Sequence, residues 1–201
     1  MARYIGPKNK LARKIGEDLG LKSNPLKVSR RLMVKPGQHG HKGSRKLSDF
    51  GTQLKEKQKL KYIYGILEKQ LRKLYEKAST DPTATGSGLL SLLERRLDNV
   101  VYRLGWAPTR AAARQLVSHG HVRVNNRKMN VASHRVQVKD VISLTDKAMK
   151  VPAVSDMLKQ EYAPAPWLQR KQAVGSVARL PERGDITEVI EEQLVVEYYS
   201  R

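Results

Sequence analysis

Two histidine pairs are the first side chains whose type and spacing could support chemistry. His39-Gly40-His41 and His119-Gly120-His121 each place two imidazoles two residues apart. Imidazoles bind zinc, but a pair with no carboxylate nearby makes a poor metal site, so packing within the fold or contact with a partner is the better interpretation. The chain contains no cysteine, which excludes thiol catalysis, disulfides and cysteine-bound zinc. The sequence therefore predicts no metal and no other cofactor.

The sequence also lacks the common enzyme motifs. It has no Gly-rich phosphate loop ending in Lys-Ser or Lys-Thr, no Gly-x-Ser-x-Gly elbow and no His-Glu-x-x-His. Gly86-x-Gly88 matches half of a dinucleotide-binding fingerprint, but no predicted strand precedes it and Ser91 occupies the third glycine position. These absences predict a protein that is not an enzyme and takes no small-molecule substrate.

Basic residues are the remaining candidates for a function. Lys and Arg number 39 against 19 Asp and Glu, a formal net charge of +20 over 201 residues. Residues 1–50 carry +10 and residues 101–150 carry +8, whereas residues 151–201 carry −2. Such an excess points to a polyanionic partner. Because only 5% of the residues are aromatic, recognition of phosphate and shape on folded RNA is favoured over stacking of single-stranded bases.

A membrane partner is not expected. Glycines and prolines interrupt residues 1–50 too often for a long amphipathic helix on a membrane surface. No apolar run approaches the ~18 residues of a membrane-spanning helix. The basic N-terminus has no apolar segment after it, unlike a secretory signal. We therefore expect a soluble, intracellular protein.

Hydrophobic periodicity predicts the helices that position the basic residues. Apolar residues at intervals of three and four predict a helix over 53–78, which Gly65 either splits or leaves whole at a close packing contact. A shorter helix is expected around residues 8–19, within an otherwise irregular N-terminal segment. Residues 79–88 have the composition of a linker and mark the best domain boundary.

Further helices and short strands follow this linker. A helix is predicted over 89–104, ended by Gly105, and another over 110–118, capped by Thr109. Glu94 and Asp98 lie away from the apolar face of the first of these helices, so they should be solvated or orient Arg95.

Alternating apolar residues predict strands over 121–124, 135–138 and 141–144, with a tight turn at Asn125-Asn126. Residues 151–175 look irregular apart from a helix near 153–162, and residues 186–199 fit either a helix or a strand. The fold class is α+β.

Two stretches carry a resemblance to a known family. Residues 92–105, LLERRLDNVVYRLG, and 109–125, TRAAARQLVSHGHVRVN, are similar to the RNA-binding module first named for the fourth small-subunit ribosomal protein. The chain also resembles the N-terminal, second and C-terminal signatures of that ribosomal family, in MARYIGP at 1–7, SDFGTQLKEKQK at 48–59 with YIYG at 62–65, and EYYSR at 197–201. The similarity covers essentially the whole chain.

The resemblance implies a structural constituent of the small ribosomal subunit. Members bind small-subunit rRNA directly at a multi-helix junction, nucleate assembly of the subunit body, contact neighbouring small-subunit proteins and influence decoding accuracy near the path by which mRNA enters. It also implies a basic N-terminal extension over 1–45, a helical domain over 46–88 completed by 176–201, and a domain over 89–175 with the module core at 92–150. A cytoplasmic ribosome is expected, and a plastid or other organellar one stays open because metal-free members occur there too.

Some positions depart from the family pattern. Residues 9–21 lack the zinc-binding cysteines that many members carry, which makes this the metal-free variety. Asn126 stands where glycine is usual, and Lys139-Asp140 replaces a common Gly-Asp. Gln169-Arg170-Lys171 occupies a stretch that is often acidic. These departures leave the local turn geometry and the surface of residues 165–175 open, but not the family.

Charge, spacing and resemblance together give the candidate RNA-binding residues. Arginine is preferred where bidentate phosphate contacts are needed, and a helix N-terminus attracts phosphate. The candidates are Arg3, Lys8, Lys10, Arg13, Lys14, Arg30, Arg31, Lys35, Lys42, Arg45, Lys46, Lys55, Lys57, Lys61, Arg95, Arg96, Arg103, Thr109, Arg110, Arg114, Gln115, His119, His121, Arg123, Arg127 and Lys128.

Two alternatives share the same module. A pseudouridine synthase would need a separate catalytic domain with an active-site Asp, and the roughly fifty residues after 150 are too few for one. A free-standing RNA-binding stress or regulatory protein would bind nucleic acid outside a stable assembly, but it would not need the N-terminal and C-terminal signatures. Recovery in fixed proportion with ribosomal subunits separates this alternative from the ribosomal interpretation.

Overall fold

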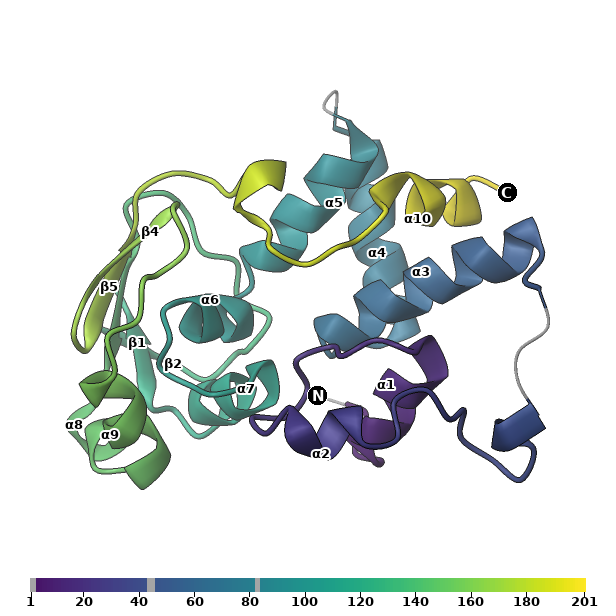
Figure 1. The fold of residues 1–201 in the computed structure, drawn as a ribbon. Helices are drawn as coiled ribbons and strands as arrows, with labels where there is room; N and C mark the ends of the chain where they lie inside the picture. The colour runs from purple at the N-terminus through teal and green to yellow at the C-terminus, as the bar shows by residue number, and fades with distance from the viewer. Residues whose placement is uncertain (1–2, 43–45, 82–83) are drawn as a thin grey trace. The chain divides into compact units, whose positions relative to one another are not determined.

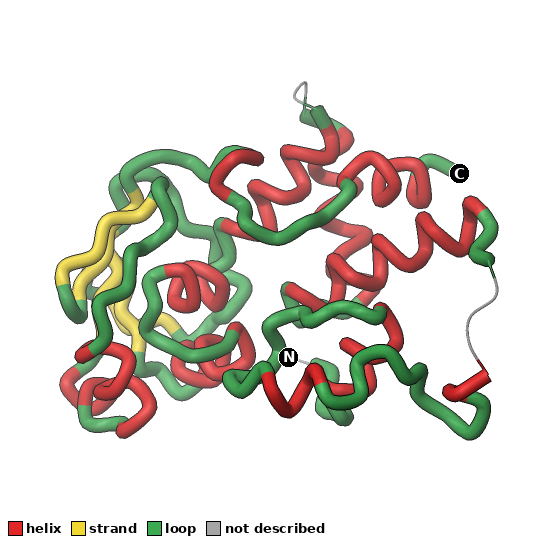
Figure 2. Tube along the Cα trace, viewed as in Figure 1, coloured by secondary structure: helices red, strands yellow, loops and turns green. Residues whose placement is uncertain are grey.

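The computed structural model describes residues 3–42, 46–81 and 84–201. Its helices and five-stranded antiparallel sheet confirm the α+β fold class (Figure 1 and Figure 2). The chain forms two compact units, one of residues 1–89 with 188–201 and the other of residues 90–187. Within the described part of the chain, no helix combines the length and the apolar character needed to cross a membrane.

The N-terminal segment contains two short helices and a single 3-10 turn. Helix α1 spans Lys8–Ile15, α2 spans Leu26–Ser29, and the turn spans Gly40–Lys42. Gly16, at a φ of +86°, ends α1 and donates its N–H to Ala12 O at 2.7 Å. Buried Ala12, Ile15, Leu19 and Val28 anchor this segment, and α1 contacts α3.

Two helices follow where periodicity predicts one long apolar stripe. Helix α3 spans Asp49–Ile63, and the Ser48 hydroxyl caps it by accepting a hydrogen bond from Gly51 N at 3.2 Å. Helix α4 spans Glu68–Ser79. Gly65 lies between them at a φ of +61°, a left-handed conformation that a helix does not contain. Gly65 therefore splits the predicted helix over 53–78 into two helices, which is one of the two alternatives expected for it.

The C-terminal tail is helical. Helix α10 spans Glu192–Tyr199 and packs against α3, beside which it lies in Figure 1. The Tyr199 ring stacks on Tyr75 with centroids 4.8 Å apart, and Tyr198 lies 5.7 Å from Phe50. Val195 is buried in the same unit. Packing on α3 therefore decides between the helix and the strand that the sequence left open.

The prediction of a single helix over 89–104 is wrong, because this segment contains parts of two helices. Helix α5 spans Thr85–Glu94 and α6 spans Leu97–Arg103. Arg96, between them, is extended at φ −69° and ψ 136° and forms an isolated antiparallel bridge with Arg135. Leu97 N donates to His134 O at 2.8 Å, so pairing with a distant segment breaks the helix. The predicted linker is also wrong from Thr85 onward, while Pro82 and Thr83 lie outside the described residues.

Helix α7 agrees with the prediction and spans Arg110–Ser118. Gly105, at a φ of +70°, follows α6 as the left-handed residue that was expected. Two short helices lie later in the second unit, α8 at Asp146–Met149 and α9 at Pro152–Lys159, the second of which confirms a helix near 153–162. A 3-10 turn spans Arg183–Asp185.

The sheet of the second unit has the strand order β2-β1-β3-β5-β4, and every pairing is antiparallel. Strands β1 and β2, Val122–Val124 and Arg127–Met129, form a hairpin whose turn holds Asn125 and Asn126 at φ of 49° and 64°. Strand β3 spans Val141–Leu144. The predicted strand over 135–138 is wrong, because only the bridge at Arg135 forms there.

Two unexpected strands complete the sheet. Strands β4 and β5 span Leu168–Lys171 and Val174–Val177, so the prediction that residues 151–175 are irregular is wrong from Leu168 onward. Arg170 explains part of the departure from the family pattern, because its guanidinium donates to Leu104 O at 2.9 Å and to Met157 O at 3.3 Å. This side chain ties β4 to the end of α6 and to α9.

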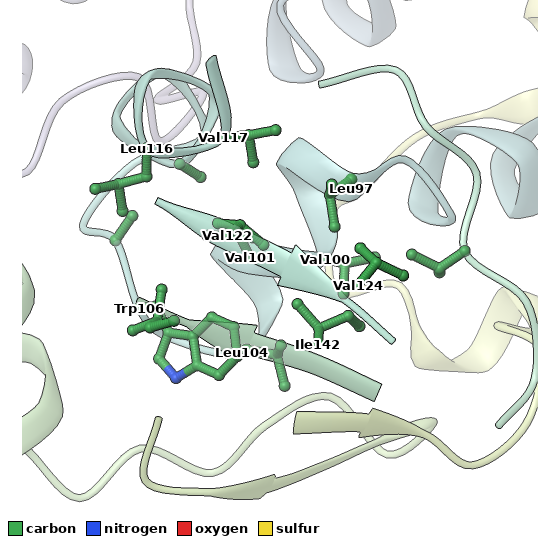
Figure 3. Packing of buried hydrophobic residues seen from close by; sticks show 14 of the residues in the cluster. Leu97, Val100, Val101, Leu104, Trp106, Leu116, Val117, Val122, Val124 and Ile142 are labelled. Atoms are coloured by element: carbon green, nitrogen blue, oxygen red, sulfur yellow. The ribbon is translucent and has the colours of Figure 1, made fainter. Parts of the chain in front are cut away.

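The core of the second unit lies between α6, α7 and the sheet (Figure 3). Leu97 and Val100 of α6, and Leu104 directly after it, meet Val122 and Ile142 of the sheet, and all five are fully buried. Each such side chain stabilises the fold by about 1.5–3 kcal/mol relative to its exposed state. This packing fixes α6 and α7, which carry Arg103, Arg110 and Arg114.

Candidate nucleic-acid interface

Helix α7 places three of the candidate residues. Its N-cap, Thr109, is extended and accepts a hydrogen bond through Oγ1 from Ala112 N at 3.2 Å, which confirms the expected cap. Arg110, Arg114 and Gln115 follow within its first two turns. The N–H groups and dipole of a helix N-terminus favour an anion, so this end of α7 suits a phosphate.

Arg110 is held on two sides by residues of α6. Its Nε donates to Asn99 Oδ1 at 2.7 Å. Its guanidinium also lies 4.6 Å from the centre of the Tyr102 ring, within the range of a cation–π interaction. These contacts restrict the rotamers of a long side chain, which lowers the entropy lost when it contacts a ligand.

Glu94 is at the centre of this arrangement. Its carboxylate accepts hydrogen bonds from Asn99 Nδ2 at 2.8 Å and from Arg103 at 2.8 and 2.9 Å. Glu94 is 1% exposed, so the expectation of a solvated carboxylate is wrong. Asn99 therefore connects Glu94 to Arg110, and Arg103 also reaches Thr187 Oγ1 at 3.3 Å.

Asp98 organises a second pair of arginines. Arg96 binds it in a fork, with Nε at 3.1 Å from Oδ1 and Nη2 at 2.7 Å from Oδ2. Arg114 Nη1 lies 3.4 Å from the same Oδ2. Asp98 is 4% exposed, so the expectation of a solvated side chain is wrong here too. Two buried carboxylates thus bind Arg96, Arg103 and Arg114.

The hairpin after α7 carries three exposed cations. Arg123 and Lys128 stand opposite each other across β1 and β2, which places them on one face of the sheet, and Arg127 is also exposed. The Lys128 side chain lies against Gly120, so a Cβ at that position would displace the flexible end of the lysine. The rings of His119 and His121 lie 6.1 Å apart on either side of that glycine. Among the described residues, no group of three or more metal-ligating side chains occurs.

Two lysines of the first unit are engaged internally. Lys57 Nζ lies 2.9 Å from Glu68 Oε1 and 4.6 Å from the centre of the Tyr198 ring. Lys57 as a whole is only 3% exposed. Lys61 Nζ lies 3.2 Å from Glu68 Oε2. Burial alone would raise the pKa of Glu68, but hydrogen bonds from Tyr199, Lys57 and Lys61 outweigh it and lower that pKa. Both lysines therefore stabilise the packing of α3, α4 and α10.

Arg13 acts as a brace in the N-terminal segment. Its guanidinium donates to Val34 O at 2.7 Å and to Lys35 O at 3.1 Å.

Lys8 is half-buried, and burial, followed by the charges of Arg3 and Lys22, lowers its pKa. Most of the other candidates in this segment are exposed, and Arg45 lies outside the described residues. The exposed ones are Arg3, Lys10, Lys14, Arg30, Arg31, Lys35, Lys42 and Lys46.

The structure therefore sorts the candidates by accessibility. Lys57, Arg96, Arg103 and Thr109 are buried. Lys55, Lys61, Arg95, Arg110, Arg114 and His121 are half-buried, whereas Gln115, His119, Arg123, Arg127 and Lys128 are exposed.

Sequence reasoning missed the role of Asn99. Its spacing of four from Arg103 places both on one face of α6, which is the signal that could have found it. Its contact with Arg110 has no such signal, because a loop separates the two helices.

Two family models match consecutive parts of the chain. The model described as "Ribosomal protein S4/S9 N-terminal domain" matches residues 3–94, and the "S4 domain" model matches residues 95–142. The second match therefore includes all four arginines that bind Glu94, Asp98 or Asn99, namely Arg96, Arg103, Arg110 and Arg114.

Curated relatives match the whole chain. The small ribosomal subunit protein uS4 of Parabacteroides distasonis is 50% identical over 204 residues, covering 100% of both chains. The uS4 of Xanthomonas campestris pv. campestris is 50% identical over 208 residues, again covering 100% of both. This family consists of structural, non-enzymatic proteins. Identity of this extent, together with the two matching models, shows that the chain belongs to the ribosomal protein S4 (uS4) family.

Proposed function

We propose that this protein is a structural constituent of the small ribosomal subunit and binds its rRNA directly. The relatives named above are small-subunit proteins, and their match over the full chain supports the same assembly here. The observation that carries direct RNA binding is the fixed position of Arg110 at the N-terminus of α7, between Asn99 and Tyr102. An arginine with restricted rotamers at a helix N-terminus suits a phosphate of folded RNA.

The exposed basic hairpin extends this surface. Arg123, Arg127 and Lys128 follow α7 directly in the chain and are exposed within the same unit. Arg96 and Arg103 contribute by a different route, since buried carboxylates fix them as a framework inside the fold. Arg114, one turn after Arg110, is half-buried and contacts Asp98, and we keep it with Arg110 as a phosphate contact. Phosphate contacts dominate affinity for RNA, whereas the shape of the folded site supplies specificity.

The finer role follows the family expectation. We propose that the protein binds a multi-helix rRNA junction early, nucleates assembly of the subunit body, and contributes to decoding accuracy beside mRNA and neighbouring small-subunit proteins. The basic extension over 1–45 and the helical part over 46–88 contribute further contacts, for which their exposed lysines and arginines are suited. The proposed location is the ribosome.

Binding to protein-free small-subunit rRNA tests the proposal. Transfer RNA and duplex DNA of equal phosphate count serve as controls across a salt series. If about ten phosphates are neutralised, the slope of log K against log salt should be near −9 by the duplex rule. Tight binding to the rRNA alone at moderate salt supports a specific folded site. Equal and steeply salt-sensitive binding to all three nucleic acids would favour the free-standing RNA-binding protein.

A further inference from the structure

An open cavity lies within the first unit, lined by the end of α1, the segment after α2, and α3 with the residues before it (Figure 1). Its volume is about 620 Å³. Small-molecule and cofactor pockets commonly measure roughly 300–1,000 Å³, so the cavity is large enough for a ligand of that class.

Aliphatic side chains form part of the lining, and two of them are left in contact with water. Met33 is 89% exposed and Leu47 is 50% exposed. Ile15 is buried, and Leu32 and Leu54 are half-buried. A ligand that covers such side chains recovers the free energy of removing apolar surface from water. The apolar part of the ligand would therefore lie between aliphatic side chains.

The same cavity is positively charged. Four cations line it, and none of them forms an ion pair with a described residue. They are Arg13, Lys14, Lys35 and Lys55. Among the described lining residues the one acid is Glu17, which is already bound to Lys59, with Oε2 2.6 Å from Nζ. The complementary ligand is therefore an anion.

Gln58 adds a polar group to the lining. Its Oε1 is buried and accepts no hydrogen bond from the described residues. An unsatisfied buried acceptor costs stability, and the fold provides no donor that holds this amide in one orientation. Rotation of the amide would bring it to a ligand in the cavity, and side-chain amides pair well with the donors and acceptors on the edges of nucleobases.

We propose that this cavity binds a single unstacked nucleotide of the bound RNA, a contact that rests on the rRNA-binding function proposed above. The base lies against the aliphatic side chains and meets the amide of Gln58, while the adjoining phosphates meet the four cations. Sequence-specific recognition of RNA targets bases that have left the stack, and enclosure between apolar side chains offsets the cost of unstacking. The proposal assigns contact with a base to the first unit.

Gly51 permits a test that fills the cavity without straining the backbone. It lines the cavity within α3, and a Cβ added there would lie 3.4 Å from atoms of Leu47 and Ser48, an ordinary contact. Gly51→Ala therefore leaves the cavity open, whereas the longer side chain in Gly51→Leu occupies part of it. Both substitutions replace a glycine within a helix, so both proteins should unfold no earlier than the wild type.

Binding to protein-free small-subunit rRNA gives the readout. Gly51→Leu should bind about tenfold more weakly than Gly51→Ala, which should match the wild type. Modification of the RNA with dimethyl sulfate and a carbodiimide should reveal a base whose reactivity changes with the wild type and Gly51→Ala but not with Gly51→Leu. Equal affinities of the two variants, or identical base reactivities, would overturn the site.

Met33 supplies a second test that does not depend on the folding of Gly51→Leu. Met33→Glu places a carboxylate at the cavity, and Leu26→Glu places one at another exposed position of the same segment, outside the lining. Because both change the net charge equally, the difference between them reports on the cavity. Met33→Glu should bind the rRNA about tenfold more weakly than Leu26→Glu, since its carboxylate repels the phosphates.

The outcomes separate this site from the proposed function. Equal affinities of Met33→Glu and Leu26→Glu, with a wild type that prefers rRNA to transfer RNA, would overturn the cavity site and leave the proposed function standing. A wild type without that preference would remove the proposed function and, with it, the contact to a nucleotide of the rRNA.

Discussion

Asn99 links a buried carboxylate to an arginine on another helix. Its Nδ2 donates to Glu94 at 2.8 Å, and its Oδ1 accepts from Arg110 Nε at 2.7 Å. Asn99 is 2% exposed, so both halves of its amide are satisfied inside the protein. The link transfers the fixed position of Glu94 in the core to the guanidinium of Arg110, so a buried acidic residue orients a cation of the proposed RNA-binding surface.

Asn99→Ala should weaken rRNA binding while the fold persists. The substitution removes the acceptor that fixes Arg110 and leaves buried polar atoms of Glu94 with fewer partners, at a cost of about 1–3 kcal/mol of unfolding free energy. Filter binding gives the affinity, and urea unfolding gives the stability. Asn130→Ala, at an exposed position in the same unit, is the control and should change neither. Wild-type affinity in Asn99→Ala would show that the fixed position of Arg110 does not matter for RNA.

Replacing Arg110 and Arg114 together by Ala should reduce the salt slope of rRNA binding. Each phosphate contact that is lost should lower the slope by about one unit, because one fewer counterion is released. The matched control replaces Lys147 and Lys150, which are exposed in and after α8, and should leave the slope unchanged. Equal slopes for the two double variants would exclude Arg110 and Arg114 from the interface.

Glu94→Gln should destabilise the second unit strongly. The carboxylate accepts two hydrogen bonds from Arg103 and one from Asn99 in a buried place, so its neutral replacement leaves an uncompensated guanidinium. Breaking a buried ion pair from one side costs about 3–5 kcal/mol, which urea unfolding can measure. Glu161→Gln, at an exposed position, should stay within about 0.5 kcal/mol of the wild type. A small effect of Glu94→Gln would mean that Arg103 finds another partner.

The stabilisation from Glu68 should disappear in acid. Burial would raise its pKa, but bonds from Tyr199, Lys57 and Lys61 lower it below the unfolded value of about 4.3. The stabilisation is therefore present at neutral pH and is lost as the pH falls through the folded-state pKa.

The measurement compares urea midpoints of the wild type and Glu68→Gln at pH 7 and pH 3. The difference between them should be clear at pH 7 and should shrink at pH 3. Glu76→Gln, in the exposed ion pair with Arg72 at 3.2 Å, should show little difference at either pH. A gap between wild type and Glu68→Gln that persists at pH 3 would contradict this linkage.

The fold class, the family and most of the local capping and turn signals could be predicted from the amino-acid order alone. Thr109 caps α7, Gly105 follows α6, and Asn125-Asn126 form the hairpin turn, because each depends only on the residue type and its immediate neighbours. The identity of the basic residues likewise predicted an RNA partner. Leu89, Leu93, Leu97, Val100 and Leu104 recur at helical spacing, so they were recognisable as core, and all five are buried.

Tertiary structure decided what depends on residues far apart in the chain. The break between α5 and α6 arises because Arg96 pairs with Arg135, and the strands β4 and β5 form because the edge of β3 offers backbone partners to a segment with little strand signal. The roles of Glu94 and Asp98 also required the fold. A helical wheel placed them toward solvent, whereas Arg103 at the end of α6 binds Glu94, and Arg96 and Arg114 bind Asp98. Long-range pairing has no signature in a local window of sequence, so only the folded chain shows which arginines bind buried carboxylates.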